Sequence, residues 1–338
     1  MRVHVFEFIC GGGLAGQPLP ASMAREGDLM LTALIADLLE LQAVEVSFAR
    51  DQRLALPPGP LSAAQVCWRS PHALPWEALA REIASCDAVW PIAPETGGEL
   101  ERAARAVLDA RRVLLGPDPD AIGLAGSKLA TAQRLAERGL EVVPCFRPGA
   151  AWPQIDGPWV LKPDDGAGGV DARVFHSRGE AASAAGAAVA KERQGLIAQP
   201  WIRGEAMSLC VVAVPGRVVV LSVNRQQVLL NRAAVELEAI DVNCEPVTAP
   251  LTALAEQVVA AIPGLRGYFG IDFVRAPAGP VVIEVNPRMT TSYAGLKAAL
   301  GINVAEWVVA GATGGSLPPA PGHRGRAVRL TLNGDATG

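Results

Sequence analysis

Hydrophobic positions follow two different periods along the first third of the chain. Strand-like alternation occurs at residues 2–10, 43–48, 88–92 and 112–115. Apolar residues at helical spacing lie between these runs, at residues 28–41, 78–85 and 98–110. Strands that alternate with helices form parallel sheets covered by helices, so the pattern predicts a doubly wound α/β domain over residues 1–116.

The remaining two thirds of the chain contain more strands and fewer helices. The turn-rich segment 116–120 marks a boundary. Helices are predicted at residues 127–138, 180–192 and 252–262. Strands are predicted at residues 142–146, 159–162, 196–199, 208–214, 218–224, 270–274 and 281–286. We expect a small α+β central lobe at 117–205, a C-terminal lobe with a mixed or antiparallel sheet at 206–313, and an irregular tail at 314–338.

Composition and charge exclude several classes of protein. Of the 338 residues, 50% are hydrophobic and the formal net charge is −4, which argues against nucleic-acid phosphate as the main partner. No 18-residue uncharged apolar run is present, and Glu7 interrupts the start of the chain, so we expect a cytoplasmic protein without a membrane span. Six scattered cysteines and four distant histidines indicate a reducing compartment and argue against a zinc site.

A glycine-rich loop after the first predicted strand resembles a dinucleotide-binding fingerprint. Residues 11–16 match the spacing G-x-G-x-x-G, whose last glycine normally lies in the helix that holds the pyrophosphate. Here Pro18 and Pro20 delay helix entry, and the next acid that closes a strand, Asp51, is too distant. The pattern favours a loop that presents backbone N–H groups to a small substrate.

A lysine at the end of a strand precedes a second glycine-rich segment. Lys162 is followed by Asp-Asp-Gly-Ala-Gly-Gly at residues 164–169. A lysine beside a flexible glycine loop supplies a point charge and backbone donors, which suits a polyphosphate that is covered and released. The segment has no Walker spacing. An ordinary glycine turn between two strands is the alternative.

The stretch from Leu196 to Glu205 combines a strand with a short connection. Its backbone N–H and C=O groups suit the edge of an adenine ring, and Glu205 follows where a carboxylate would accept hydrogen bonds from ribose hydroxyls. Taken alone, the stretch is explained more simply as a strand and a turn.

Polar residues interrupt two apolar strands near the end of the predicted sheet. Asp272 lies in one strand, and Glu284 and Asn286 lie in the next. Because alternate residues of a strand share a face, Glu284 and Asn286 point together. Ile283 and Val285 are then expected to point into the core. Two carboxylates and an amide oxygen on one face predict a Mg²⁺ site that ATP phosphates complete.

Arg288 follows the second of these strands, after Pro287 ends it. Its guanidinium is predicted to neutralise charge that develops on a transferred phosphoryl group. A solvated sheet face would explain the alternation, but not a Glu-Val-Asn-Pro-Arg run opposite an acid in an apolar strand.

Together these residues resemble the ATP-grasp superfamily over about residues 1–313. The resemblance implies an ATP-grasp fold, ATP as the nucleotide and Mg²⁺ as the metal, with Mn²⁺ as a substitute. The nucleotide-binding residues that it implies are Lys128, Lys162, Gly166, Gly168, Gly169, the adenine hinge from Gln199 to Ile202, and the ribose acid Glu205. The magnesium ligands that it implies are Asp272, Glu284 and Asn286. The hinge opens with glutamine, where many members have glutamate.

Three further motifs resemble one group within the superfamily. Residues 6–13, 26–31 and 286–296 are similar to the tyramine–glutamate ligases of methanofuran biosynthesis and their relatives in methylotrophic bacteria. The implied activity is an ATP-dependent ligase that joins an amino-acid carboxylate, glutamate, to an amine. The reaction passes through an acyl phosphate, releases ADP and phosphate, and needs no side-chain nucleophile.

The geometry of phosphoryl transfer predicts where the carboxylate lies, and the amine is expected on the N-terminal side. Phosphoryl transfer requires the carboxylate in line with the γ-phosphate, so Arg288 and Ser292 are expected to face the carboxylate. Gly12, Gly13 and Glu26 are expected to face the amine. For Glu26, an acid stabilised by the dipole at a helix N-terminus is an equal alternative.

Other functions stay open at this level. They are an ATP-grasp phosphotransferase, a carboxylating enzyme, a peptide-type ligase with unrelated substrates, and a non-catalytic nucleotide-binding subunit. The expected partners are a small-molecule amine and an amino acid, with no nucleic acid or membrane, and a homodimer is left open.

Overall fold

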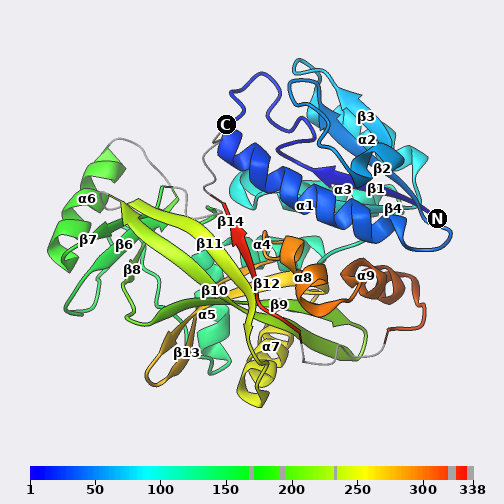
Figure 1. Cartoon of the computed structure of the whole chain (residues 1–338). Coiled ribbons are helices and arrows are strands. Elements are labelled where there is room, and N and C mark those ends of the chain that lie inside the picture. The colour runs from blue at the N-terminus through cyan, green and yellow to red at the C-terminus, as the bar shows by residue number, and fades with distance from the viewer. Residues whose placement is uncertain (167–170, 191–194, 232–233, 319–324, 333–338) are drawn as a thin grey trace.

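The computed structural model describes residues 1–166, 171–190, 195–231, 234–318 and 325–332. Its N-terminal part is a parallel sheet in the order β3-β2-β1-β4-β5 (Figure 1). The strands are β1 (Arg2–Glu7), β2 (Glu45–Asp51), β3 (Gln65–Arg69), β4 (Ala88–Ile92) and β5 (Val113–Leu114). The connecting helices are α1 (Ala21–Leu39), α2 (Pro75–Ser85) and α3 (Glu99–Asp109), with short 3-10 turns at Pro60–Ala63 and Thr96–Gly98. The predicted doubly wound parallel sheet is confirmed.

The order of these strands determines where a ligand can enter. The chain moves outward from β1 to β3 and then returns to β4 on the other side of β1. In open α/β sheets such a reversal leaves a crevice at the carboxyl ends of the two central strands. Glu7, at the end of β1, is in register with Ile92 at the end of β4. These two strand ends define the N-terminal half of the site described below.

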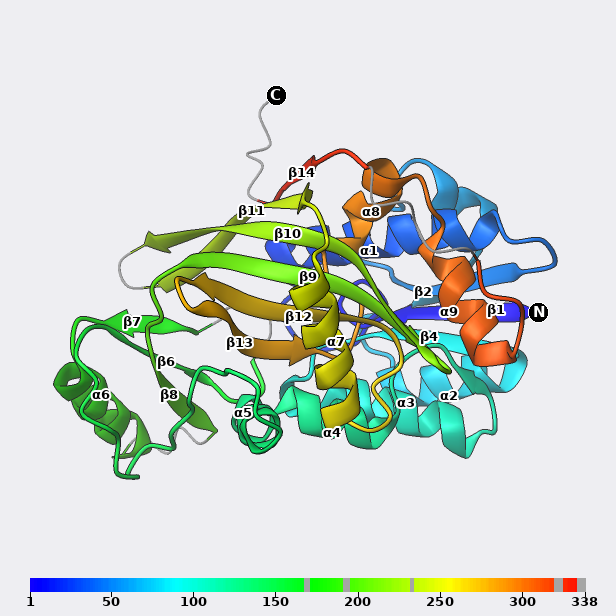
Figure 2. The same ribbon diagram turned by 90° about the horizontal axis from the view of Figure 1, so that it is seen from below.

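The rest of the chain is built on a nine-stranded sheet in the order β13-β12-β9-β10-β11-β7-β6-β8, with β14 paired to β11 (Figure 2). Its named strands pair antiparallel. They are β6 (Trp159–Pro163), β7 (Arg173–Phe175), β8 (Leu196–Pro200), β9 (Glu205–Val214), β10 (Arg217–Asn231), β11 (Ala234–Glu245), β12 (Gly267–Ala276), β13 (Gly279–Asn286) and β14 (Val328–Thr331). The helices are α4 (Pro119–Gly126), α5 (Lys128–Glu137), α6 (Arg178–Ala190), α7 (Ala249–Ala261), α8 (Tyr293–Leu300) and α9 (Val304–Thr313).

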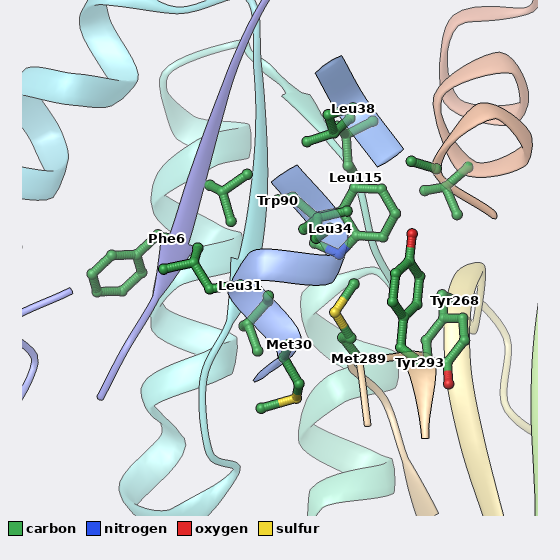
Figure 3. Packing of buried hydrophobic residues seen from close by; sticks show 14 of the residues in the cluster. Phe6, Met30, Leu31, Leu34, Leu38, Trp90, Leu115, Tyr268, Met289 and Tyr293 are labelled. Carbon is green, nitrogen blue, oxygen red and sulfur yellow. The ribbon is translucent and has the colours of Figure 1, made fainter. Parts of the chain in front are cut away.

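One hydrophobic core joins the N-terminal sheet to the C-terminal lobe. Leu34 and Leu38 of α1 lie beside Met289 and Tyr293 in Figure 3, and all four belong to the same buried cluster. Asp37 of α1 strengthens this contact, because it accepts a hydrogen bond from the Tyr293 hydroxyl at 2.7 Å. The central lobe has a separate small core around Trp152 and Trp159 with the alanines of α6. The C-terminal lobe and the N-terminal domain are therefore packed together, and the central lobe is packed mainly on itself.

Several elements differ from the prediction. The sequence pattern predicts no element at β3, β7, β11, α4, α8 or α9. The tail at 314–338 is not wholly irregular, because β14 extends the sheet beside β11. Residues 142–146 make only isolated bridges, one of them to β13. Helices α4 and α5 contribute Ala121, Ala125 and Leu135 to the core of the C-terminal lobe, although residues 117–205 are predicted to form the central lobe. Within the described residues, no helix is long and apolar enough to cross a membrane.

Candidate active site

One large cleft contains most of the residues that the sequence predicts as functional. It has a volume of about 1030 Å³ and lies between the ends of β1 and β4 and the faces of β6, β8, β12 and β13. Ligand pockets commonly measure roughly 300–1,000 Å³, so this cleft has room for a nucleotide and a second molecule. The predicted residues that line it are Glu26, Lys128, Lys162, Gly166, Gln199, Ile202, Glu205, Asp272, Glu284, Asn286, Arg288 and Ser292. Gly168 and Gly169 lie outside the described residues.

The acidic face of the cleft comes from two neighbouring strands. Asp272 on β12 and Glu284 on β13 are direct cross-strand partners. Asn286, two residues further along β13, donates from Nδ2 to Asp272 Oδ2 at 3.2 Å. Ile271 and Phe273, on either side of the aspartate, are buried in the core as the alternation predicts. The three polar side chains therefore lie on one face of the sheet.

The prediction that Ile283 points into the core is wrong. The strands pair at Asp272 and Glu284, but the next pair is Phe273 with Val282, so Ile283 is an extra residue in a β-bulge. Its side chain lines the cleft, whereas Val282 is buried. The bulge places an apolar side chain beside the acidic face, where strict alternation would have hidden it.

Two lysines converge on the carboxylate of Glu284. Lys128 Nζ, at the start of α5, lies 3.2 Å from Glu284 Oε2, and Lys162 Nζ, on β6, lies 3.9 Å from the same oxygen. Burial lowers the pKa of Lys162, and the charge of Glu284 partly offsets this. Burial alone would raise the pKa of Glu284, but the two ammonium groups outweigh it and lower this pKa. An incoming phosphate group would replace the carboxylate as the partner of both lysines.

The donor set of this face fits a divalent cation. Burial and the neighbouring charge of Glu284 raise the pKa of Asp272 to about 7, so the two carboxylates destabilise each other's charged form. A cation between them would remove that repulsion. The acidic face has only two carboxylates, and among the described residues no group of three His, Cys, Asp or Glu side chains is placed to hold a metal. Two carboxylates and an amide suit Mg²⁺, which commonly takes its other ligands from substrate phosphates and water.

The predicted nucleotide hinge lies at the end of β8. Gln199 is 3% exposed, and its Nε2 donates to Cys145 Sγ at 2.9 Å, so its side chain anchors the strand. Ile202 lines the cleft beyond it. Glu205 begins β9 and also lines the cleft, but Arg275 donates from Nε to its Oε2 at 2.9 Å. A ribose hydroxyl would therefore share this carboxylate with a guanidinium group.

Arg288 and Ser292 lie in the loop between β13 and α8, and both line the cleft. Ser292 is 3% exposed. Arg288 Nε lies 3.1 Å from the carboxylate of Glu95, which follows β4 in the N-terminal domain. Burial would lower the pKa of this guanidinium, but the charge of Glu95 raises it. Arg288 is therefore held in its charged form beside the acidic face.

The structure gives Gly12 and Gly13 another role than the one predicted, because neither is among the residues that line the cleft. A Cβ on Gly13 would overlap the Phe8 ring, and Gly12 has a φ of +86°, which L residues rarely adopt. The loop is glycine-rich because it packs closely against its own strand. The loop opens no dinucleotide-binding helix, because α1 begins only after Pro20.

Glu26 lies on α1 and faces the C-terminal lobe across the cleft. Its Oε2 accepts a hydrogen bond from Thr291 Oγ1 at 3.2 Å. Burial raises the pKa of Glu26, and the Thr291 hydrogen bond and the charge of Arg288 partly offset the rise. The first turn of α1 contains no acidic residue, so the helix-dipole alternative for Glu26 is wrong.

The sequence analysis missed two acids at the carboxyl ends of the central strands. Glu7 ends β1 and lines the cleft, and Glu95 follows β4. Glu7 is 2% exposed, and its Oε2 accepts a hydrogen bond from the backbone N–H of Cys10. A Cβ on Gly27 would lie 2.7 Å from the same oxygen, so α1 can approach Glu7 only with glycine there. The strand order, which locates the crevice, is the signal that would have found both acids.

Glu7 predicts a pH-dependent stability, because burial raises its pKa from 4.5 to about 7. The folded state binds this proton more tightly than the unfolded chain. The contribution to the free energy of unfolding is therefore complete below about pH 4.5 and is lost as the pH rises through about 7. A shift of this size corresponds to about 3 kcal/mol.

The glutamine in Glu7→Gln cannot titrate. We therefore expect the stability of this variant, relative to that of the unchanged protein, to increase as the pH is raised from about 5 to about 8. Thermal unfolding at both pH values measures the difference in Tm. A difference that stays constant with pH would contradict this account of Glu7.

Comparisons with known proteins agree with this architecture. Residues 125–292 match the family model of the ATP-grasp domain, and residues 44–122 match that of the pre ATP-grasp 3 domain. No curated protein matches the chain in sequence.

Solved structures share the fold over nearly the whole chain. A protein from Archaeoglobus fulgidus described as a member of the ATP-grasp superfamily is 22% identical with a TM-score of 0.70, over 98% of this chain and 92% of that one. The L-amino acid ligase of Bacillus licheniformis is 18% identical with a TM-score of 0.64, over 92% and 73%. The biotin carboxylase domain of Hydrogenobacter thermophilus 2-oxoglutarate carboxylase, in complex with MgADP and bicarbonate, is 17% identical with a TM-score of 0.69, over 95% and 71%. With an N-terminal parallel sheet and an antiparallel lobe that both match, the chain belongs to the ATP-grasp superfamily.

Proposed function

We propose that this protein is an ATP-dependent ligase that joins an amino-acid carboxylate to an amine through an acyl phosphate. The observation that carries the proposal is the meeting of three groups in one cleft. Two lysines contact Glu284, Asp272 is the cross-strand partner of Glu284, and Arg288 lines the same cleft. The cleft then continues to the ends of β1 and β4, where a second substrate has room.

Different residues of the chain act on different parts of the two substrates, the nucleotide and the metal. Lys128 and Lys162 bind the ATP phosphates, and the backbone of the hinge after Gln199 binds the adenine. Asp272, Glu284 and Asn286 would hold Mg²⁺, which supplies charge neutralisation at the transferred phosphoryl group. Arg288 and Ser292 orient the carboxylate so that one of its oxygens is in line with the γ-phosphorus.

The reaction requires that the substrates are positioned and that water is excluded from the cleft, more than it requires a reactive side chain. A carboxylate oxygen takes the γ-phosphoryl group, ADP leaves, and the amine then attacks the acyl carbon and releases phosphate. Water would destroy the acyl phosphate, so the cleft must exclude it. We propose that the central lobe, which packs mainly on its own core, covers the nucleotide.

The charge of the N-terminal end supports an amine as the second substrate. Glu7 and Glu26 both line it, and the charge of Asp28, which forms an ion pair with Arg50, also acts on Glu7. Ile9, Met23, Met30 and Ile92 line the same end. An ammonium group with an apolar body suits this surface. On the resemblance of its motifs, we propose glutamate as the carboxylate and methanofuran-type cofactor biosynthesis as the setting.

Release of ADP tests the proposal directly. The protein is incubated with Mg²⁺, ATP and L-glutamate, with and without a panel of amines that includes tyramine. We expect ADP release that requires both the amino acid and an amine. ADP release with bicarbonate alone, or no release with any pair, would contradict the ligase assignment.

The proposal predicts a selective effect on the amine at Glu26. We expect Glu26→Ala to raise the KM for the amine by roughly tenfold, because an ion pair with a half-buried carboxylate is lost. The KM values for ATP and the amino acid stay near those of the unchanged protein. Steady-state kinetics measures all three, and Glu40→Gln, at the C-terminal end of α1, is the control. An unchanged amine KM with a lowered Tm would remove Glu26 from the substrate site.

A further inference from the structure

The loop after β4 in the N-terminal domain contacts both other parts of the site. Its Glu95 carboxylate meets Arg288 of the C-terminal lobe at 3.1 Å. The next residue, Thr96, donates from Oγ1 to the carbonyl oxygen of Asp165 at 2.9 Å. The backbone N–H of Gly97 donates to Asp165 Oδ2 at 3.0 Å. Asp165 lies at the start of the glycine-rich segment, so this short loop contacts both Arg288 and the residues that follow β6.

The pair between Glu95 and Arg288 is buried and joins residues 193 positions apart. The exposed fractions of the two side chains are 6% and 13%. Glu95 Oε1 has no hydrogen-bond partner among the described residues, although it lies 3.1 Å from Arg288 Nε. A buried pair of this kind gains little net stability, but loss of either partner leaves an uncompensated charge.

The contacts of Arg288 show which side of its guanidinium is held. Nε donates to Glu95, and Nη1 donates to the backbone oxygen of Met289 at 3.2 Å. Nη2 makes no hydrogen bond to the part of the chain that the structure describes, and the residue lines the cleft. Besides Glu95, the charges of Asp272, Glu284 and Glu26 act on this guanidinium, and the first two belong to the acidic face.

We propose that Glu95 is a positioning residue that keeps Arg288 directed at the carboxylate substrate and away from the acidic face. The inference rests on the proposed function, because it takes the carboxylate as the partner of Arg288. Through Thr96 and Gly97 the same loop fixes the start of the glycine-rich segment.

An ion pair with a purely structural role would act only by holding the N-terminal domain against the C-terminal lobe. The molecule contains another ion pair between these two parts that can serve as a control. Lys297 Nζ lies 3.0 Å from Asp37 Oδ1, which also joins the C-terminal lobe to the N-terminal domain. Neither residue lines the cleft. Lys297→Gln therefore breaks a docking contact and leaves the site untouched.

Kinetics of five variants tests the proposal. With L-glutamate as the carboxylate, we expect Glu95→Ala to lower kcat/KM for glutamate by about 100-fold and Glu95→Gln by about 10-fold, since glutamine still accepts from Nε. The KM for ATP changes by less than about threefold, and Lys297→Gln behaves like the unchanged protein. The double variant Glu95→Ala with Arg288→Ala falls no further than Arg288→Ala. Additive losses, an unaffected Glu95→Ala, or an equal loss in Lys297→Gln would overturn the proposal.

Amide hydrogen exchange separates failure of this proposal from failure of the proposed function. It is measured with Mg²⁺ and a non-hydrolysable ATP analogue, so it needs no knowledge of the carboxylate. We expect faster exchange at residues 286–292 and 163–166 in Glu95→Ala, a smaller increase in Glu95→Gln, and none in Lys297→Gln. If glutamate supports no turnover, this pattern still upholds the positioning role. Unchanged exchange in Glu95→Ala would overturn it whatever the substrate is.

Discussion

Glu284→Gln is expected to reduce turnover about 1,000-fold and leave the fold intact, because it removes charge from the centre of the acidic face. Glutamine has nearly the same shape, so packing on β13 is preserved. Lys128 and Lys162 lose their shared counter-ion at the same time. We therefore expect the variant to bind ATP without metal at least as tightly as the unchanged protein. Isothermal calorimetry measures this affinity, and ADP release measures turnover.

Glu245→Gln is the matched control for this result. Glu245 pairs with Arg225 and Arg275 in the same lobe but does not line the cleft. Its replacement changes charge by the same amount, and we expect turnover close to that of the unchanged protein. Near-normal ADP release by Glu284→Gln would show that the acidic face does not hold the metal.

Lys162→Met is expected to weaken ATP binding by about 10-fold to 100-fold, which is the loss of one charge-assisted hydrogen bond to phosphate. Stability should change little. Burial lowers the pKa of Lys162, so the ammonium is costly in the folded protein, and methionine fills a similar volume without charge. Glu284 keeps Lys128 as its partner in this variant.

Calorimetric titration with ATP and Mg²⁺ measures the affinity, and thermal unfolding measures the stability. Lys297→Met, on α8 and away from the cleft, is the control. A Lys162→Met variant that binds ATP as tightly as this control would remove Lys162 from the nucleotide site.

The acidic face could be predicted because it depends on local sequence. Alternation places Glu284 and Asn286 on one side of a strand, and Asp272 interrupts an apolar strand whose neighbours are buried. The resemblance of the motif order supplied the two lysines and the hinge. What local reasoning could not supply is the bulge at Ile283, because it depends on how two strands pair.

The contacts between the N-terminal domain and the two lobes could not be predicted from one sequence. Glu95 meets Arg288 across 193 residues, and Thr291 meets Glu26 across 265. Both depend on the core that joins α1 to the loop before α8. Gly12 and Gly13 are predicted to face the amine substrate because they follow a strand. The acid that lines the cleft there is Glu7, at the end of that strand itself.

Transfer of an oxygen atom from the carboxylate to phosphate tests the central claim most directly. L-glutamate labelled with ¹⁸O in both side-chain and α-carboxylate groups is incubated with the protein, Mg²⁺, ATP and the amine that supports ADP release. If an acyl phosphate forms, its bridging oxygen comes from the amino acid and leaves with the phosphate. The account predicts one ¹⁸O atom in each phosphate released. Phosphate without ¹⁸O, released together with the amide product, would contradict it.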